Sequence, residues 1–188
     1  GTRATHPGRW VAEAQWPSAD IGRRIYYLNA DHGLAGGAGP ARDLPIRSPA
    51  YVGQACGEWM AAGCPGELPT DQRVDDALSL AFDTPTLPAD CEILGAPELD
   101  LLLSADKPVA QIGVRLMDVA PDGAALRVSY QVLNLTHRDS HARPEPLEPG
   151  KRYRVQVKLN DCAHRFAAGH RIRFSSSTGC WPVLWKVT

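Results

Sequence analysis

An apolar residue at every second position marks several short segments in the second half of the chain. Because successive side chains of a β-strand point to opposite faces, this period of two predicts strands with one buried face. In residues 151–160 the apolar set is Tyr153, Val155, Val157 and Leu159. In residues 171–174 the same pattern predicts that Ile172 and Phe174 point inward and that Arg171 and Arg173 point outward.

Two further alternating segments flank a tight-turn signal and predict a β-hairpin. The dipeptide Asp122-Gly123 between them is strongly favoured in hairpin turns. On the first segment the residues expected to share a face are Ile112, Val114 and Leu116. On the second segment they are Leu126, Val128, Tyr130 and Val132.

The rest of the chain is less regular but keeps the character of short strands. Residues 98–103 predict a strand in which Leu99, Leu101 and Leu103 align, with Leu102 a candidate for burial on the opposite face. Residues 9–17, 23–29 and 77–85 predict further strands, and residues 31–33 predict a turn. The 17 glycines and 16 prolines punctuate the chain every few residues. Many short strands separated by turn signals predict an all-β fold, a β-sandwich or jelly roll.

The segment Leu34–Pro69 is the least regular part of the chain and is rich in Gly and Pro. A loop of this length inside a compact domain is usually functional or packed on another element. Trp59 and Met60 lie in its most apolar part. We therefore expect the loop to lie across one end of the sandwich, with Trp59 and Met60 facing a pocket or a domain interface.

Composition limits the classes of partner. A length of 188 residues is enough for one domain, and a net charge of −1 argues against nucleic acid as the main partner. No apolar run reaches the length of a membrane span. The start of the chain has no apolar core of a secretory signal and does not resemble a natural start, so we expect a fragment. The compartment is left open, with a cytoplasmic location favoured.

The five cysteines predict mostly reduced, buried thiols. They are an odd number, and no two of them have the C-x-x-C spacing of zinc ribbons. Cys56 and Cys64 lie close enough in the Gly/Pro-rich loop to form a disulfide, which is the less favoured alternative.

No catalytic or metal-ligating set is predicted. The chain lacks the Gly-x-Ser-x-Gly nucleophile motif, and Ser175, Ser176 and Ser177 are interpreted as an exposed or edge-strand run. His137 and His141 would share a metal on a helix, but on a strand they would lie roughly 13 Å apart, and three prolines follow them. We interpret them as part of a polar connection.

Three other groups have simple structural interpretations. Cys162, His164 and His170 form a loose set without a second half-site for a metal, and a loop followed by a strand accounts for them. Asp71, Asp75 and Asp76 lack the spacing of a calcium loop and are expected to form ion pairs with Arg73. The five tryptophans, at positions 10, 16, 59, 181 and 185, are expected in the core or an interface, with sugar binding as an alternative.

Several phrases taken in order resemble one protein family. They include RWVAEAQWP, LPTDQRVDDALSLAFDTPTL, DVAPDG, VLNLTHRDSH and AAGHRIRFSSSTGCWP. The chain resembles, from about Arg9 to Pro182, the C-terminal domain of the X-Pro dipeptidyl-peptidase/cocaine esterase (CocE/NonD) family of serine hydrolases. The resemblance implies a jelly-roll β-sandwich, similar to galactose-binding domains. Family members continue with further strands, so we expect the last strands to be missing here and an edge to be left open.

The resemblance also implies a function. The Ser-Asp-His triad of the family lies in an α/β-hydrolase domain that this chain does not contain, so residues 1–188 are expected to form one accessory domain, inactive alone. Its expected partner is the hydrolase domain of the same parent, which would hydrolyse esters or X-Pro peptides without a cofactor or metal. A carbohydrate-binding module and a self-associating structural domain remain alternatives.

Overall fold

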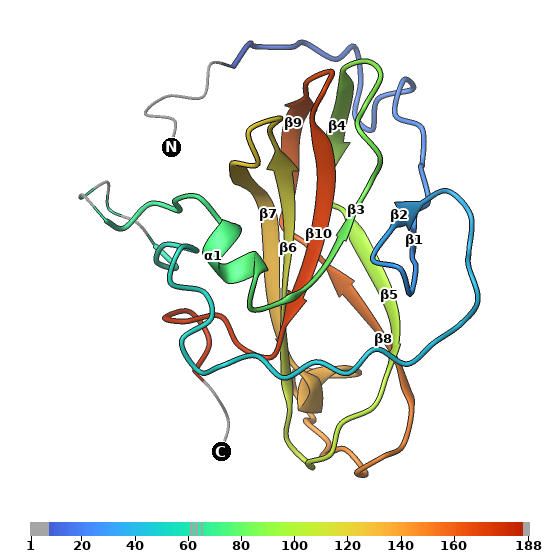
Figure 1. The fold of residues 1–188 in the computed structure, drawn as a ribbon, viewed down its shortest axis with the longest axis vertical. Coiled ribbons are helices and arrows are strands. Elements are labelled where there is room, and N and C mark those ends of the chain that lie inside the picture. The colour runs from blue at the N-terminus through green and yellow to red at the C-terminus, as the bar shows by residue number, and fades with distance from the viewer. Residues whose placement is uncertain (1–7, 61, 63, 65, 186–188) are drawn as a thin grey trace.

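A four-stranded antiparallel sheet forms one layer of the molecule (Figure 1). The structure is a computed structural model that describes residues 8–60, 62, 64 and 66–185. The strand order in this sheet is β3 (Leu80–Asp83), β10 (Arg171–Ser177), β6 (Gln111–Val119) and β7 (Ala125–Asn134). We call the face that meets the second layer the inner face and the opposite one the outer face.

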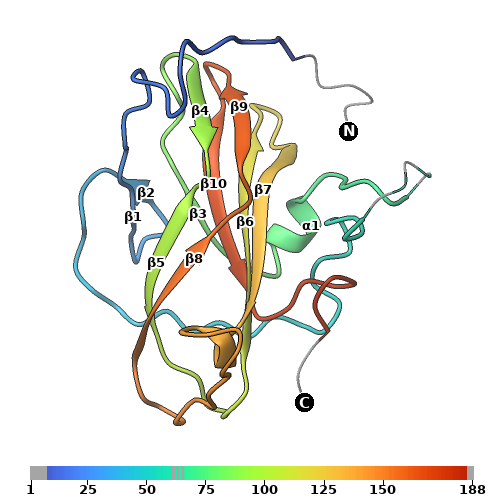
Figure 2. The ribbon, with the colours of Figure 1, turned by 180° about the vertical axis from the view of Figure 1, so that it is seen from behind.

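Two strand pairs form the second layer, which Figure 2 shows from behind. They are β4 (Cys91–Gly95) with β9 (Cys162–Phe166), and β5 (Glu98–Leu103) with β8 (Tyr153–Lys158). Side chains from both layers, such as Phe174 and Phe166, meet in one hydrophobic core. Antiparallel strands in two packed layers confirm the expected all-β sandwich.

The remaining elements are short. Strands β1 (Tyr27–Leu28) and β2 (Leu34–Ala35) pair across the turn that the sequence predicts at residues 31–33. The helix α1 (Arg73–Asp76) and the 3₁₀ turn η1 (Leu135–His137) are the only helical elements among the described residues. None of the helical segments described is long and apolar enough to cross a membrane.

The strongest alternating segment follows its prediction. In β8, Val155 and Val157 are buried in the core, whereas Arg154, Gln156 and Lys158 are exposed. Ile172 and Phe174 on β10 are also buried, as expected. Arg173 departs from its prediction, because its side chain is largely covered and contacts two carboxylates on the outer face.

The hairpin of β6 and β7 forms as predicted, but a β-bulge divides the expected face of β7. Gly123 has a φ of 84° and its N–H donates to Ala120 O at 2.8 Å, closing the turn. The register shifts between Leu116 and Met117. As a result Val128 packs against the core, while Tyr130 contacts Trp59. The prediction that Leu126, Val128, Tyr130 and Val132 share one face is therefore wrong, since a bulge reverses the alternation.

Two other expectations about strands are wrong. Leu102 is 66% exposed, because the outer side of β5 faces solvent and is not covered by another element. Residues 9–17 have no strand, and their large side chains Trp10 and Trp16 face solvent. A strand requires a partner with which to pair its backbone groups, and this segment has none among the described residues.

The two edge strands of the four-stranded sheet, β3 and β7, are partly covered. Next to β3, Asp83 N–H donates to His32 O at 3.0 Å, and His32 Nδ1 lies 3.0 Å from Ala81 O. Next to β7, Asn160 N–H donates to Tyr130 O at 3.3 Å. Contacts of this kind reduce the number of free backbone groups that would otherwise invite edge-to-edge pairing.

The Gly/Pro-rich loop and α1 cover the outer face of the sheet (Figure 1). Met117 and Val119, which point toward this face, are 0% and 1% exposed. Central strand β6 is therefore buried on both faces. The loop approaches the C-terminal segment closely at Gly53, where φ is 108° and Trp181 N–H donates to Val52 O at 2.7 Å.

Replacing Gly53 by alanine should therefore destabilise the domain more than replacing Gly66. A Cβ atom at Gly53 would lie 2.5 Å from Trp181 N, whereas one at Gly66, whose φ is also positive, would meet nothing within 4 Å. We expect Gly53→Ala to cost about 2–4 kcal/mol and Gly66→Ala about 1–2 kcal/mol, because only the first adds a clash to the backbone strain. Urea unfolding of both variants measures the difference, and equal losses would contradict this packing.

Candidate functional site

Trp59 and Met60 lie on the surface of the loop that covers the outer face. Their exposed fractions are 64% and 81%, so neither belongs to the core of the sandwich. The rings of Trp59 and Tyr130 on β7 make an edge contact, with centroids 6.5 Å apart. The guanidinium of Arg127 stacks on the Tyr130 ring, 4.2 Å from its centroid. Tyr130 and Arg127 thus support Trp59 from below, while Met60 faces solvent.

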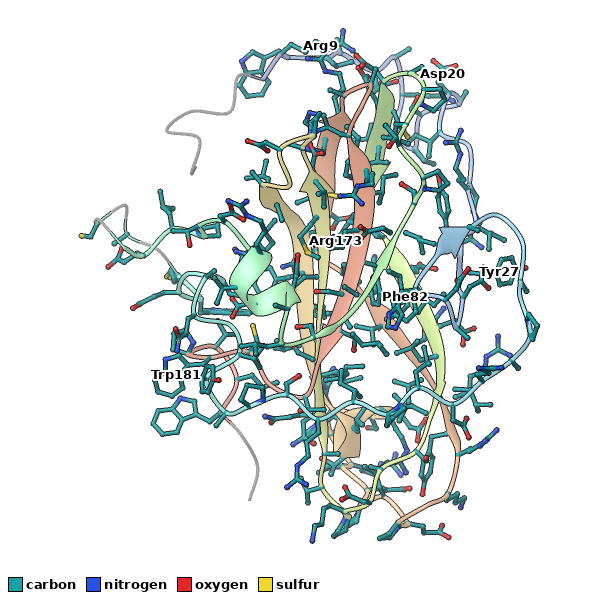
Figure 3. The ribbon with its side chains drawn as sticks, in the orientation of Figure 1. Arg9, Asp20, Tyr27, Phe82, Arg173 and Trp181 are labelled. Atoms are coloured by element: carbon teal, nitrogen blue, oxygen red, sulfur yellow. The ribbon has the colours of Figure 1, made fainter. Side chains whose placement is uncertain are left out.

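A second pair of aromatic side chains lies on the same side of the molecule. Trp181 and Trp185 have ring centroids 4.9 Å apart and are 38% and 71% exposed. Gln111 on β6 donates through Nε2 to Trp185 O at 2.6 Å. Figure 3 shows Trp181 beside the covering loop, far from Tyr27 on the β1–β2 hairpin. We call Trp59, Met60, Trp181 and Trp185 the aromatic rim.

A buried ionic cluster lies beneath the loop and attaches it to the sheet. Arg115 on β6 is 2% exposed and lies 3.6 Å from Asp75 and 3.3 Å from Asp76, both on α1. Asp75 in turn accepts hydrogen bonds from Gly53 N–H at 2.7 Å and Ala55 N–H at 2.8 Å. Charged and polar contacts therefore connect the sheet to α1 and α1 to the loop.

Arg173 extends this cluster along β10 (Figure 3). It donates to both oxygens of Asp83, at 2.6 and 2.8 Å, and to Asp76 at 3.1 Å. The hydrogen bonds that Arg173 donates to Asp83 raise the pKa of Arg173 further above its usual value. Burial raises the pKa of Asp76, which the nearby Arg115 and Arg173 only partly offset. The name ionic cluster is used below for Arg115, Arg173, Asp75, Asp76 and Asp83.

The expected ion pairing of Arg73 is only partly correct. Arg73 pairs with Asp71 at 2.7 Å on the surface. Asp75 and Asp76 instead point to Arg115, because the single turn of α1 turns both carboxylates toward the sheet. The two aspartates are thus internal partners of the sheet rather than partners of their sequence neighbour.

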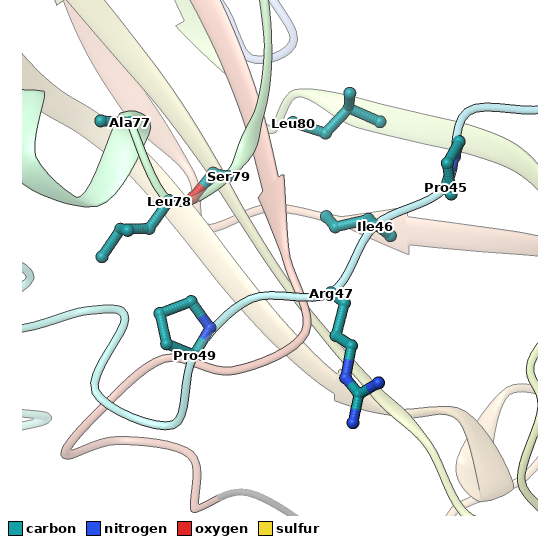
Figure 4. A pocket seen from close by; sticks show the side chains of 8 residues that line it. All are labelled: Pro45, Ile46, Arg47, Pro49, Ala77, Leu78, Ser79 and Leu80. Atoms are coloured by element: carbon teal, nitrogen blue, oxygen red, sulfur yellow. The ribbon is translucent and has the colours of Figure 1, made fainter.

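An open groove runs beside the cluster, between the loop and the start of β3 (Figure 4). It has a volume of about 320 Å³ and is lined mainly by apolar side chains, among them Ile46, Pro49, Leu78 and Leu80. Arg47 also lines it and extends its guanidinium away from Leu80. Ser79 fixes one wall, since its hydroxyl accepts from Arg115 at 2.9 Å and donates to Asp75 O at 2.6 Å.

Two buried cysteines meet where the loop contacts the C-terminal segment. Both thiols are buried, whereas Cys64 is exposed. Cys56 Sγ donates to Gln72 Oε1 at 3.6 Å, and a Cβ atom on Gly53 would lie 2.8 Å from Cys180 C. The neighbouring Cys180 thiol and the charge of Arg115 lower the pKa of Cys56, against the effect of burial. The expectation of buried thiols holds for these two.

Four of the histidines form two separate groups. Asp118 on the inner face of β6 is hydrogen-bonded to His164 Nε2 at 3.0 Å and to His170 Nδ1 at 2.6 Å. A carboxylate only accepts, so both ring nitrogens donate. Burial alone would raise the pKa of Asp118, but the two histidine hydrogen bonds outweigh it and lower that pKa. Cys162 stays apart and donates weakly to Gly95 O.

His137 and His141 lie closer together than expected. Their ring centroids are 5.5 Å apart because η1 coils the chain at His137, so the strand spacing of roughly 13 Å used to separate them is wrong. Among the described residues, however, no group of three or more His, Cys, Asp or Glu side chains could hold a metal ion.

The serine run is buried rather than exposed or at an edge. Ser175, Ser176 and Ser177 are between 0% and 7% exposed and lie on β10, which has neighbours on both sides. Ser177 donates to Gly179 O at 2.6 Å. The interpretation of this run as an exposed or edge-strand segment is therefore wrong, because β3 and β6 flank it.

Fold and site together define an all-β domain whose loop-built face is apolar on the outside and ion-paired on the inside. The chain belongs to the family of X-Pro dipeptidyl-peptidase C-terminal non-catalytic domains, which it matches over residues 2–188. The family resemblance found in the sequence is thereby confirmed.

Individual relatives agree with this membership. The chain is 25% identical over 188 residues to a cocaine esterase of Rhodococcus sp. (strain MB1 Bresler), covering 92% of the chain and 32% of that protein. Among solved structures, it matches an α-amino acid ester hydrolase with a TM-score of 0.77, at 24% identity, over 92% of this chain and 32% of the other.

An aminopeptidase of a marine sediment Thaumarchaeota archaeon matches with a TM-score of 0.76, at 22% identity, over 95% of this chain and 33% of the other. At these identities the two structures show a common fold. The chain spans about a third of the length of the relatives that it matches.

Sequence reasoning missed the central residue of the site, Arg115. Alternation placed it on a solvated face, since Val114 and Leu116 point inward. Met117 and Val119 on that same face were the available signal, because two apolar residues there indicate a covering element. The pairing of Cys56 with Cys180 had no local signal, since only the folded chain brings these residues together.

Replacing Arg115 by methionine should strongly destabilise the domain. The change keeps most of the side-chain volume but leaves Asp75 and Asp76 without their shared cation, and losing one partner of a buried pair costs about 3–5 kcal/mol. The control Arg154→Met removes the exposed pair with Asp100 and should leave the urea midpoint nearly unchanged. Similar midpoints for both variants would show that the cluster does not hold the loop.

Replacing Asp118 by asparagine should remove a pH-dependent part of the stability. Because the folded-state pKa lies below the usual value of 3.8, ionised Asp118 stabilises the fold above that pH, and the contribution disappears as the pH falls through the lowered pKa. We expect Asp118→Asn to lower the free energy of unfolding by about 1–3 kcal/mol at neutral pH, with the gap closing in acid. Denaturant unfolding measured across pH tests this. A gap that widens in acid would contradict it.

Proposed function

We propose that this chain is the C-terminal accessory domain of a serine hydrolase and packs on an α/β-hydrolase domain through the aromatic rim. The parent would hydrolyse an ester or an X-Pro peptide bond through a serine acyl-enzyme. The observation that carries the proposal is the exposure of Trp59 and Met60, 64% and 81%, on the face that the loop builds. Exposed aromatic and Met side chains of this kind are enriched in interfaces.

The support beneath the rim favours the same role. Trp59 rests on Tyr130, and the loop that carries it is held by Asp75 through two backbone N–H groups. A rigid, preformed surface loses little conformational entropy when it docks on a partner. In this proposal Trp59 and Met60 either bury against the catalytic domain or close one wall of its substrate pocket.

The proposal assigns no catalytic residue to this chain. Ser175, Ser176 and Ser177 are buried within a central strand, and Ser177 is occupied by a hydrogen bond to Gly179 O. His164 and His170, the histidines nearest to a carboxylate, are used by Asp118 inside the sandwich. The chain on its own is therefore expected to be inactive toward esters.

Sugar binding is the second candidate, and one observation favours it. The rings of Trp181 and Trp185 are exposed and lie side by side, 4.9 Å apart. Paired aromatic rings of this kind could stack on a sugar, and binding to a glycan array that is lost in Trp185→Ala would favour this alternative. Self-association through the same rim is a third candidate, which light scattering separates from a monomer.

Alanine at Trp59 or Met60 in the protein that carries the catalytic domain tests the docking role. We expect Trp59→Ala to lower kcat/KM at least about tenfold, or to lower the unfolding temperature, since a central aromatic residue of an interface contributes about 2 kcal/mol or more. The control is Leu102→Ala, which removes a side chain of similar exposure, 66%, on the opposite layer. If both variants behave like the unmodified enzyme, the rim is not the interface.

A further inference from the structure

Cys56 and Cys180 are far apart in the sequence, yet the fold brings the two segments that carry them together. They are 0% and 3% exposed, and a Cβ atom on Gly53, three residues before Cys56, would lie 2.8 Å from Cys180 C. Cys56 lies in the covering loop, and Cys180 begins the segment that carries Trp181 and Trp185. We propose that these two residues form a disulfide when a hydroperoxide oxidises them, which links the two halves of the aromatic rim covalently.

The backbone on both sides of the pair is already fixed. Trp181 N–H donates to Val52 O at 2.7 Å, and Cys56 N–H donates to Gly53 O at 2.8 Å. Leu184 N–H donates to Cys180 O at 2.6 Å, and Arg127 donates to Cys56 O. Disulfide bonds have a narrow range of backbone separations, and hydrogen-bonded segments that hold two buried cysteines near each other favour this geometry.

The surroundings of Cys56 favour the reactive thiolate. Arg115 Nη1 lies 3.7 Å from its sulfur, and the neighbouring Cys180 thiol and this cation lower the pKa of Cys56, which favours the thiolate. Thiolates near cationic side chains are the form that peroxides oxidise. Cys180, whose pKa is raised by the neighbouring Cys56 thiol and by burial, keeps its proton.

The chemistry balances in two steps. The Cys56 thiolate attacks hydrogen peroxide, the O–O bond breaks, and Cys56 becomes a sulfenic acid while hydroxide leaves and takes up a proton to form water. The sulfur of Cys180 then attacks the Cys56 sulfur, its proton is lost, and a second water leaves as the S–S bond forms. Two thiols and one peroxide give one disulfide and two waters. Hydrogen peroxide is small enough to enter on local opening of the loop.

The other cysteines provide internal comparisons. Cys64 is exposed and lies in the same loop, so it reports on simple accessibility. Cys162 is half-buried, and burial raises the pKa of its thiol, which disfavours the thiolate. If accessibility alone decided oxidation, Cys64 would react first. Proximity and charge instead select the buried pair.

The experiment treats the 188-residue chain with a small excess of hydrogen peroxide, followed by thiol counting in denaturant and non-reducing peptide mapping. We expect two thiols to be lost and a peptide containing Cys56 linked to Cys180 to appear. The unfolding temperature should rise by about 5 °C or more and return after reduction, because the bond closes a long loop in the unfolded chain.

Three variants sharpen the test. Cys56→Ser and Cys180→Ser should each prevent the crosslink, and Cys64→Ser should retain it with the same rise in unfolding temperature. The peptide map of the unmodified chain keeps the test valid even if a serine variant folds poorly. The proposal is overturned if Cys56 links to Cys64, if the oxidised product is a Cys64-bridged dimer, or if Cys56 and Cys180 remain thiols while other cysteines react.

Discussion

The buried guanidinium of Arg115 is the constraint on which the covering loop, α1 and the C-terminal segment depend. A cation that is 2% exposed is costly unless carboxylates and other acceptors surround it. The chain meets this requirement by turning α1 so that Asp75 and Asp76 both face the sheet. Asp75 then holds the loop through Gly53 and Ala55, and the loop holds the C-terminal segment through Val52. One charge thus organises three segments that share almost no regular secondary structure.

Strand β6 carries one buried charge on each of its two faces. One charge attaches the covering loop, and the other attaches the second layer of strands. Arg115 points outward to the covering loop, whereas Asp118 points inward to His164 on β9 and His170 next to β10. Apolar packing between the layers supplies most of the burial but has little directional preference. The polar contacts of Arg115 and Asp118 have defined directions and partners. They therefore determine where the second layer and the loop lie relative to the central strand.

Local patterns predicted the strands of the second half of the chain well, and long-range covering elements poorly. The alternation in β8 and the Asp122-Gly123 turn are local properties, and the structure agrees with both. The predicted face of β7 is wrong because a bulge shifts the strand pairing by one residue. The alternation of apolar residues in the sequence does not reveal such a shift. The partners of Asp75 and Asp76 were misassigned for a similar reason. Their cation lies on a strand far along the chain, so proximity in the sequence pointed to Arg73 instead.

The candidate site shows the same difference between features that depend on local sequence and features that depend on long-range contacts. Composition predicted a long irregular loop over residues Leu34–Pro69, and its apolar part led to the prediction that Trp59 and Met60 face a pocket or a domain interface. What composition could not supply is the support underneath. Tyr130 reaches Trp59 only because the bulge turns it to the outer face, where Arg127 also stacks on it. The irregularity that defeats the sequence pattern is therefore the feature that positions the exposed tryptophan, and a regular β7 would place Tyr130 in the core and leave Trp59 without its platform.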